Sequence, residues 1–156
     1  MEKLNIGDKA PQFKAVDQNE NEITLNDLLG HKTILFFYPK DNTPGCTAEA
    51  CNLRDNYDDF KKNGYKIYGV SPDTPKKHQN FITKFDFPFP LISDPEKSLI
   101  EAFGVWGLKK FMGREYMGLH RTTFVLDEKG IVTHRIDKVK TKAHSQQLKE
   151  ELGITA

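Results

Sequence analysis

Hydrophobic residues follow two alternating patterns along this chain, continuous apolar runs and stripes that recur every three or four residues. The run at 33–38 (TILFFY) is typical of a strand buried on both faces, and 65–71 and 90–93 predict two further buried strands. Between the first two runs, apolar side chains at helical spacing are Cys46, Ala50, Leu53, Tyr57 and Phe60. This alternation predicts β-α units whose strands lie parallel in one sheet.

Proline residues mark where three helices are expected to begin. Pro44, Pro75 and Pro95 each suit the first helical position, and each directly follows a residue whose side-chain oxygen can cap a helix. We expect the second of these helices to end near residue 85 and the third near residue 103.

Segments toward both ends of the chain predict antiparallel pairs. Residues 13–16 and 22–25 indicate a small hairpin, followed by a brief helical turn that ends at Gly30. Residues 122–126 and 131–136, separated by turn residues, indicate a second hairpin.

Two more segments complete the predicted fold. Residues 141–152 predict a closing helix with Gly153 as its stop. The stretch 104–120 contains four glycines and no clear period, so we expect a loop there. The whole pattern predicts one α/β domain, residues 1–156, with a mixed central β-sheet flanked by helices on both faces.

Composition narrows the functional classes. The 156 residues carry 23 basic and 22 acidic side chains, a net charge of +1, so no global field attracts nucleic acid or an anionic membrane. The first ten residues lack the apolar core of a signal peptide, and the longest strongly apolar run is far too short to cross a bilayer. We therefore expect a soluble, cytoplasmic protein.

Both cysteines lie in the segment 39–51 (PKDNTPGCTAEAC), and Cys46 falls in the first turn of the helix expected from Pro44. Unpaired backbone N–H groups and the positive end of the helix dipole favour a thiolate there, which predicts a reactive thiol rather than a buried one. In a reducing cytosol, a cysteine pair is more often catalytic, redox-sensing or metal-binding than structural. Metal binding has weak support, because the five histidines are scattered and none forms a close ligand pair with a cysteine.

Four residues match the active-site pattern of a known family. Pro39, Thr43 and Cys46 fit the pattern PxxxTxxC, and Arg121 stands at the head of RTTFVLD. On these residues, and over essentially its whole length, the chain resembles a peroxiredoxin of the bacterioferritin-comigratory-protein or peroxiredoxin Q group. The resemblance implies a thioredoxin-like fold and a catalytic role for all four residues, with Pro39 shielding the thiolate from water.

Two further residues of the Cys46 helix extend the resemblance. Cys51 matches the second cysteine of the group, and Glu49 matches an acidic residue common after the first. The resemblance implies that the Cys46 thiolate attacks hydrogen peroxide or an organic hydroperoxide and becomes a sulfenic acid. Cys51 then forms a disulfide with it, and thioredoxin or a related dithiol reduces that disulfide. The residues expected to contact the peroxide are Thr43, Cys46, Glu49 and Arg121.

The same resemblance implies a monomer that needs no cofactor and no metal. Its partners would be the peroxide and the dithiol reductant, with no nucleic acid and no membrane. The expected activity is that of a thioredoxin-dependent peroxidase, an antioxidant oxidoreductase with a redox-active disulfide.

The spacing of Thr43 and Cys46 is that of a capping box, with a thiolate in place of the usual carboxylate. We expect the Thr43 hydroxyl and the Arg121 guanidinium to converge on the sulfur and on a bound peroxide. Lowering the pKa of a thiol from about 8.5 to about 6 raises the thiolate fraction at pH 7 only ~30-fold, and it also reduces nucleophilicity. A fast peroxidase must therefore stabilise the charge that moves to the leaving oxygen as well.

The five-residue separation of the two cysteines predicts a conformational change. In an intact helix, residues i and i+5 lie about 8 to 9 Å apart at Cα, whereas a disulfide seldom spans more than about 7 Å. We therefore expect the first turns of the helix to unwind when Cys46 and Cys51 form a disulfide.

Simpler interpretations remain open. Cys46 is compatible with a buried small hydrophobic residue on the apolar stripe, Cys51 with an incidental free thiol, and Glu49 with an ordinary exposed helix residue. A thiol-disulfide oxidoreductase of the same fold is an alternative, although its cysteines are normally separated by two residues and here four intervene. A non-catalytic redox sensor is another. Catalytic consumption of peroxide with thioredoxin distinguishes a peroxidase from both.

Overall fold

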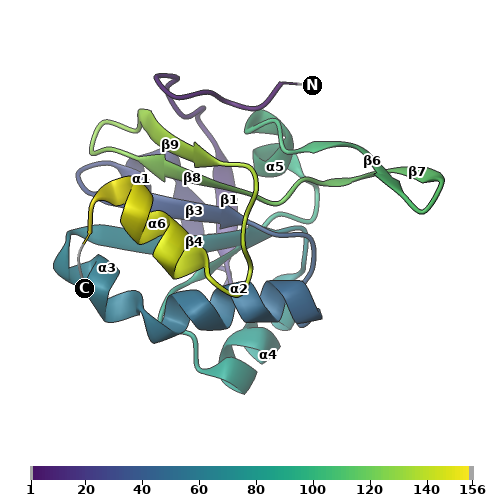
Figure 1. Cartoon of the computed structure of the whole chain (residues 1–156), viewed down its shortest axis with the longest axis horizontal. Coiled ribbons are helices and arrows are strands. Elements are labelled where there is room, and N and C mark those ends of the chain that lie inside the picture. The colour runs from purple at the N-terminus through teal and green to yellow at the C-terminus, as the bar shows by residue number, and fades with distance from the viewer. Residues whose placement is uncertain (1, 155–156) are drawn as a thin grey trace.

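A seven-stranded mixed sheet runs through the middle of the protein (Figure 1). The computed structural model describes residues 2–154. The strands are β1 (Lys14–Asp17), β2 (Glu22–Thr24), β3 (Lys32–Phe37), β4 (Tyr65–Ser71), β5 (Leu91–Ser93), β8 (Thr122–Leu126) and β9 (Val132–Ile136). Their order is β2-β1-β5-β4-β3-β8-β9, with β3, β4 and β5 parallel and the outer strands paired antiparallel. The predicted mixed sheet is confirmed.

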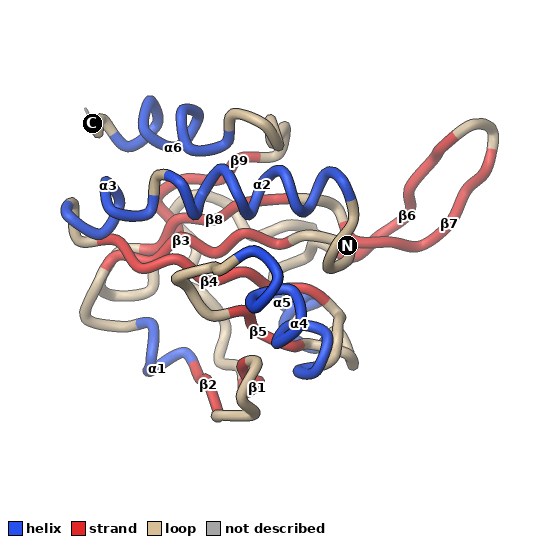
Figure 2. Tube along the Cα trace, turned by 90° about the horizontal axis from the view of Figure 1, so that it is seen from below, coloured by secondary structure: helices blue, strands red, loops and turns tan. Residues whose placement is uncertain are grey.

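Helices cover both faces of this sheet, as predicted. They are α1 (Leu25–Leu28), α2 (Pro44–Asp55), α3 (Tyr57–Lys62), α4 (Pro75–Phe85), α5 (Ser98–Ala102) and α6 (His144–Leu152). Seen edge-on, α2, α3 and α6 lie along one side of the sheet, whereas α1 and α5 pack into the apolar layer on the other side (Figure 2). None of these helices, which are those found in residues 2–154, is long and apolar enough to span a membrane.

β3 supplies side chains to both apolar layers, because successive residues of a strand point to opposite faces. Ile34 and Phe36 pack into the layer under α2 and α6, and Leu35 and Phe37 pack into the layer under α1 and α5. All four side chains are fully buried, which confirms the predicted strand with two covered faces. The loop that leads to Cys46 starts from the end of this strand.

Residues 104–120 form a projecting two-stranded hairpin, so the predicted loop is wrong (Figure 1). Its strands are β6 (Trp106–Phe111) and β7 (Arg114–Leu119), which pair antiparallel. The turn residues Met112 and Gly113 have φ values of 50° and 79°, the positive values that a two-residue hairpin turn of this kind requires. Beyond its base the hairpin is exposed on both faces, so its strands lack the alternation of polar and apolar residues that marks a half-buried strand.

Helix boundaries differ from the predictions in three places. The apolar stripe that starts at Cys46 is divided between α2 and α3, with a break between them. The α5 helix begins at Ser98 rather than at Pro95, and the Asp94 side chain accepts a hydrogen bond from the backbone N–H of Ile100. The α6 helix begins at His144 rather than at residue 141, and the other elements begin and end close to the predicted residues.

Gly69 lies where β4 approaches its neighbours too closely for a side chain. A Cβ atom there would lie 2.6 Å from Cδ2 of Leu91 and 2.8 Å from Cζ of Phe36. We expect Gly69→Ala to lower the free energy of unfolding by about 1–3 kcal/mol, because buried neighbours must shift. Urea denaturation measures this effect, with Gly107→Ala as the control, since its nearest neighbour is Nε2 of His120 at 3.5 Å. Equal stability of the two variants would contradict the packing argument.

Candidate active site

Cys46 is the third residue of α2, just beyond the loop that follows β3. The helix begins as predicted, with Thr43 at the N-cap position and Pro44 as its first residue. The face of α2 that carries Cys46 packs on the sheet, which leaves only 1% of the Cys46 surface exposed. Contrary to the prediction, the thiol is therefore buried, and it lies beside a charged partner.

That charged partner is Arg121, which the structure brings to Cys46 as predicted. Nη2 of Arg121 donates to Sγ of Cys46 over 3.2 Å, and Nη1 donates to Oε1 of Glu49 over 2.6 Å. Burial lowers the pKa of Arg121, but Glu49 and Cys46 raise it by more, so the guanidinium stays charged. A fixed positive charge at this distance stabilises negative charge on the sulfur.

Strand register brings Arg121 to Cys46 across 75 residues of sequence. β8 pairs antiparallel with β3, and its first residue, Thr122, lies opposite Phe37. Arg121 therefore stands beside the end of β3, where the loop to α2 begins. Gly45 leaves room for the guanidinium, because a Cβ atom at this residue would lie 3.3 Å from Nη2 of Arg121.

The predicted capping box between Thr43 and Cys46 is wrong. The Thr43 hydroxyl donates to the backbone carbonyl of Lys40 over 2.9 Å and does not cap α2. Because its hydrogen is held by that carbonyl, the hydroxyl oxygen can accept a further hydrogen bond but cannot donate one. Thr43 is thus suited to receive the O–H of a peroxide rather than to stabilise a thiolate.

Pro39 and Cys51 stand at the two ends of the predicted active-site segment. Pro39 is half-buried in the loop between β3 and α2. Cys51 is half-buried on α2 and packs against the same apolar layer as Cys46, and burial raises the pKa of its thiol. Both cysteines are free thiols on one continuous helix. Their predicted roles as shield and resolving cysteine stay predictions.

Glu49 connects this pocket to α6 through a buried contact with His144. Oε2 of Glu49 has no hydrogen-bond partner among residues 2–154, and it lies 3.6 Å from Nε2 of His144. Both side chains are fully buried. Sequence reasoning missed His144, because no spacing signal relates residues on helices so far apart in the chain.

Hydrogen bonding and burial together favour a neutral imidazole at His144. Gln147 donates from Nε2 to the Lys138 carbonyl and accepts at Oε1 from the N–H of Lys140. The same Oε1 therefore accepts from Nδ1 of His144, at 2.9 Å. Nε2 of His144 then accepts from the Thr123 hydroxyl, at 2.8 Å. Burial lowers the pKa of His144 to about 4, in agreement with this neutral form.

A neutral His144 that accepts at Nε2 has no hydrogen to offer Glu49, so the Glu49 carboxyl is favoured in its protonated form. Burial raises the pKa of Glu49 to about 7, although Arg121 acts to lower it. Near neutral pH, Glu49 is present in both protonation states, and its charge competes with that of the Cys46 thiolate for one guanidinium. The Glu49 side chain is fully buried. Its predicted contact with the substrate stays a prediction.

Known proteins are similar to this chain in both sequence and fold. Residues 6–135 match the AhpC/TSA family. The chain is 44% identical to peroxiredoxin Bcp of Escherichia coli over 144 residues, 92% of each protein, and 45% identical to peroxiredoxin Bcp of Bacillus subtilis over 141 residues, 90% of each. The structure of Xanthomonas campestris peroxiredoxin Q is similar with a TM-score of 0.84 and 38% identity, over 90% of this chain and 89% of that one. A mutant of Xylella fastidiosa PrxQ is similar with a TM-score of 0.90 and 29% identity, over 98% of both chains.

Glu49 and His144 contribute to stability with opposite pH dependence. The pKa of Glu49 is raised from 4.5 to about 7 in the folded protein, so its contribution is complete below pH 4.5 and is lost as the pH rises to 7. The pKa of His144 is lowered from 6.5 to about 4, so its contribution is complete above pH 6.5 and is lost as the pH falls to 4. Each contribution is about 3 kcal/mol, at about 1.36 kcal/mol per pKa unit.

Single variants should separate these two contributions, which nearly cancel in the wild-type protein. Between pH 4.5 and 6.5, we expect Glu49→Gln to gain stability relative to wild type as the pH rises, and His144→Gln to lose it. Chemical denaturation at a series of pH values measures both slopes, with His134→Gln as a control at a half-buried histidine of β9. Parallel curves for the two test variants and wild type would show that neither group is shifted as described.

Proposed function

The chain belongs to the AhpC/TSA family, as a peroxiredoxin of the Bcp and peroxiredoxin Q group, and from this premise we propose that Cys46 reduces hydrogen peroxide and organic hydroperoxides to water and alcohols. The observation that carries the proposal is the 3.2 Å contact between Nη2 of Arg121 and Sγ of Cys46 in the first turn of α2. A guanidinium and a helix N-terminus both favour the thiolate, which is the attacking form of cysteine.

The first step transfers one oxygen atom from the peroxide to sulfur. The Cys46 thiolate attacks the terminal peroxide oxygen, so the S–O bond forms while the O–O bond breaks. Sulfur is oxidised to a sulfenic acid and the peroxide is reduced. The leaving alkoxide or hydroxide takes up a proton and departs as alcohol or water.

Arg121 and Thr43 suit the movement of charge in this step. Arg121 can donate to the sulfur and to a peroxide oxygen beside it, so it stabilises negative charge at both ends of the transfer. Thr43, whose hydrogen is held by the Lys40 carbonyl, can accept the peroxide O–H and orient the O–O bond. Pro39 has no N–H to hold a water molecule, which suits a shield over the thiolate.

Glu49 supports the reaction through Arg121. Its 2.6 Å hydrogen bond to Nη1 fixes the guanidinium plane, and Nη2 of the same plane contacts Cys46. A protonated Glu49 leaves the full charge of Arg121 to the thiolate, whereas an ionised Glu49 shares that charge.

Cys51 completes the catalytic cycle. Its thiol condenses with the sulfenic acid at Cys46, the S–S bond forms and water leaves. Since intact α2 holds the two cysteines about 8 to 9 Å apart at Cα, the first turns must unwind before this bond forms. Thioredoxin or a related dithiol then reduces the disulfide by exchange. We expect the protein to act as a cytoplasmic monomer formed by one domain.

The substrate class extends to organic peroxides by analogy with a relative. The bacterioferritin comigratory protein of Xanthomonas campestris is described as having alkyl peroxide reduction activity.

A thiol-disulfide oxidoreductase or a redox sensor of the same fold is the alternative. Neither needs a guanidinium at the attacking sulfur, because neither has to stabilise charge on a leaving peroxide oxygen. The contact between Arg121 and Cys46 therefore favours the peroxidase.

Intact-mass analysis after one equivalent of peroxide tests the roles of the two cysteines. The parent protein should lose two hydrogen atoms and both free thiols, because Cys46 and Cys51 form a disulfide. Cys51→Ser should instead gain one oxygen atom at Cys46, and Cys46→Ser should not react quickly. Turnover with thioredoxin provides the functional readout. Full turnover by Cys46→Ser would refute the proposed function.

Hydrogen exchange tests the unwinding of α2. Protection of the backbone N–H groups of residues 46–55 should fall when the disulfide forms, because an intact helix keeps the cysteines too far apart. Cys51→Ser treated with one equivalent of peroxide is the control, since it reaches the sulfenic acid without a disulfide. Near-identical protection in the reduced and disulfide forms would exclude unwinding.

A further inference from the structure

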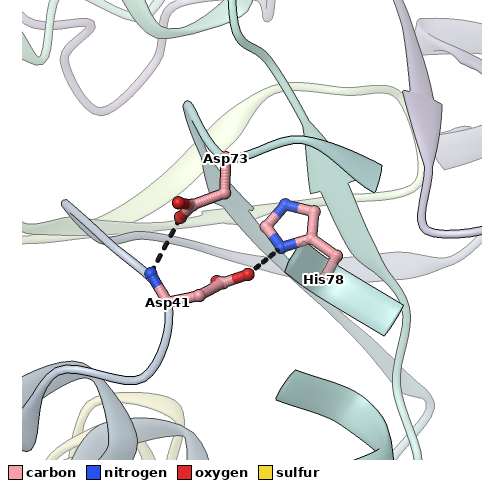
Figure 3. Close-up of side chains that lie close together, drawn as sticks. All are labelled: Asp41, Asp73 and His78. Atoms are coloured by element: carbon pink, nitrogen blue, oxygen red, sulfur yellow. Dashed lines mark hydrogen bonds and ion pairs between the residues drawn. The ribbon is translucent and has the colours of Figure 1, made fainter. Parts of the chain in front are cut away.

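A second buried polar cluster lies beside the loop that leads from β3 to α2 and Cys46 (Figure 3). It consists of Asp41, Asp73 and His78, all buried. The Asp41 carboxyl group is hydrogen-bonded to Nδ1 of His78 and accepts from the Tyr38 hydroxyl, each over 2.6 Å. The backbone N–H of Asp41 donates to the Asp73 carboxylate over 2.8 Å. Asp41 is thus held by its main chain and its side chain together.

Both ring nitrogens of His78 make buried hydrogen bonds. Nδ1 faces the Asp41 carboxylate, and Nε2 lies 3.0 Å from the backbone carbonyl of Ile92. A backbone carbonyl can only accept, so Nε2 donates to Ile92, and Nδ1 shares a hydrogen with the Asp41 carboxyl group. His78 and Asp41 therefore form a hydrogen-bonded pair excluded from water, with side-chain exposures of 0% and 5%.

The cluster joins four segments of the fold. Asp41 belongs to the loop after β3, and Asp73 to the turn between β4 and α4. His78 lies near the start of α4, and its carbonyl partner Ile92 lies in β5. Asp73 also accepts from the Ser71 hydroxyl over 2.6 Å. The loop is thereby tied to the half of the sheet that does not carry Arg121.

Asp41, Asp73 and His78 are residue types that bind metal ions, and one ligand atom from each lies within 4.8 Å of the others. Hydrogen bonds already occupy both nitrogens of His78, both carboxylate oxygens of Asp41 and one oxygen of Asp73. A metal ion would have to displace a proton from His78 and break these bonds. These contacts hold the loop in place rather than form a metal centre, and we refer to Asp41, Asp73 and His78 together as the tether.

Two residues, Asn42 and Thr43, separate the tethered Asp41 from the first residue of α2. Asn42 has a φ of 59°, a left-handed conformation that asparagine adopts more readily than most residues. A segment this short transmits the position of Asp41 directly to the first turn of α2. Arg121 is placed separately by the pairing of β8 with β3. The sulfur and the guanidinium are therefore positioned by two different parts of the fold.

We propose that Asp41, Asp73 and His78 are positioning residues for the peroxidase reaction. They hold the backbone that presents Cys46 to Arg121, and they form the fixed end from which α2 unwinds when the disulfide forms. The inference rests on the proposed function, because it needs Cys46 as the attacking residue. A weaker tether lets the first turn of α2 move in the reduced protein, which slows attack on peroxide but does not slow disulfide formation.

Rapid-quench kinetics with intact-mass detection measure the two steps separately. Asp41→Asn keeps the side-chain shape and removes the charge, and His78→Asn removes the bridge to Ile92. In both variants we expect the second-order rate constant with hydrogen peroxide to fall about tenfold or more, while disulfide formation stays as fast as in wild type or becomes faster. Lys77→Gln is the matched control, an exposed residue next to His78 that should leave both steps unchanged.

Hydrogen exchange of the reduced variants locates the effect. Protection should fall in residues 41–50 and stay at the wild-type level in β4 and β5. Folded variants with wild-type kinetics, or with both steps slowed alike, would overturn the inference. If neither variant folds, Tyr38→Phe decides: it removes one hydrogen bond to Asp41 and keeps the ring, so it should show the same split between steps with a smaller effect.

The same measurements distinguish this inference from the proposed function. Loss of turnover in Cys46→Ser, together with wild-type kinetics in the tether variants, would reject the tether and leave the peroxidase in place. Full turnover in Cys46→Ser would reject the peroxidase itself.

Discussion

A guanidinium that is removed from water is stable only beside negatively charged groups. The active site of this peroxiredoxin is built around Arg121, which has this requirement. Two residues one turn apart on α2, Cys46 and Glu49, each take one nitrogen of the fork, at 3.2 Å and 2.6 Å. The positive charge therefore has two effects. It stabilises negative charge on the buried sulfur, and it orients the face of α2 that carries Cys46 and Glu49. Because burial raises the pKa of Glu49 to about 7, the second anion is only partly ionised near neutral pH, which leaves more of the charge to the sulfur.

This arrangement sets a conflict within α2. The helix must be intact for its N-terminus to favour a thiolate and for Cys46 and Glu49 to share the Arg121 fork. In the proposed cycle, the same helix keeps Cys51 out of reach of the sulfenic acid, and burial raises the pKa of the Cys51 thiol. Activation and resolution in that cycle would thus need two conformations of one segment. A firmly tied starting point at Asp41 allows the segment to change conformation while β3 and its neighbours stay in place.

Whether a feature could be predicted from the sequence depends mainly on how far apart in the chain its interacting residues lie. The buried strand at β3, the helix start at Pro44 and the cap at Thr74 depend on residues within a few positions of one another, and all were predictable. The hairpin of β6 and β7 was missed, because it projects from the fold and shows no buried face in its pattern. The capping box at Thr43 failed for a local reason: a nearby carbonyl, that of Lys40, binds the hydroxyl instead.

The amino-acid sequence alone identifies the candidate reacting groups and places the two cysteines on a helix. Two cysteines five residues apart, a proline and a threonine before the first, and a matching arginine are sufficient to indicate the family. Which of these groups are buried, and which partners each one contacts, follows from the packing of helices and strands that are distant in the chain. His144 beside Glu49 and His78 beside Asp41 have the same side chain in different surroundings: Nε2 of His144 faces the Thr123 hydroxyl, whereas Nε2 of His78 donates to the Ile92 carbonyl. These surroundings are set by which donors and acceptors the sheet register and helix packing bring to each ring, and no local stretch of sequence carries that information.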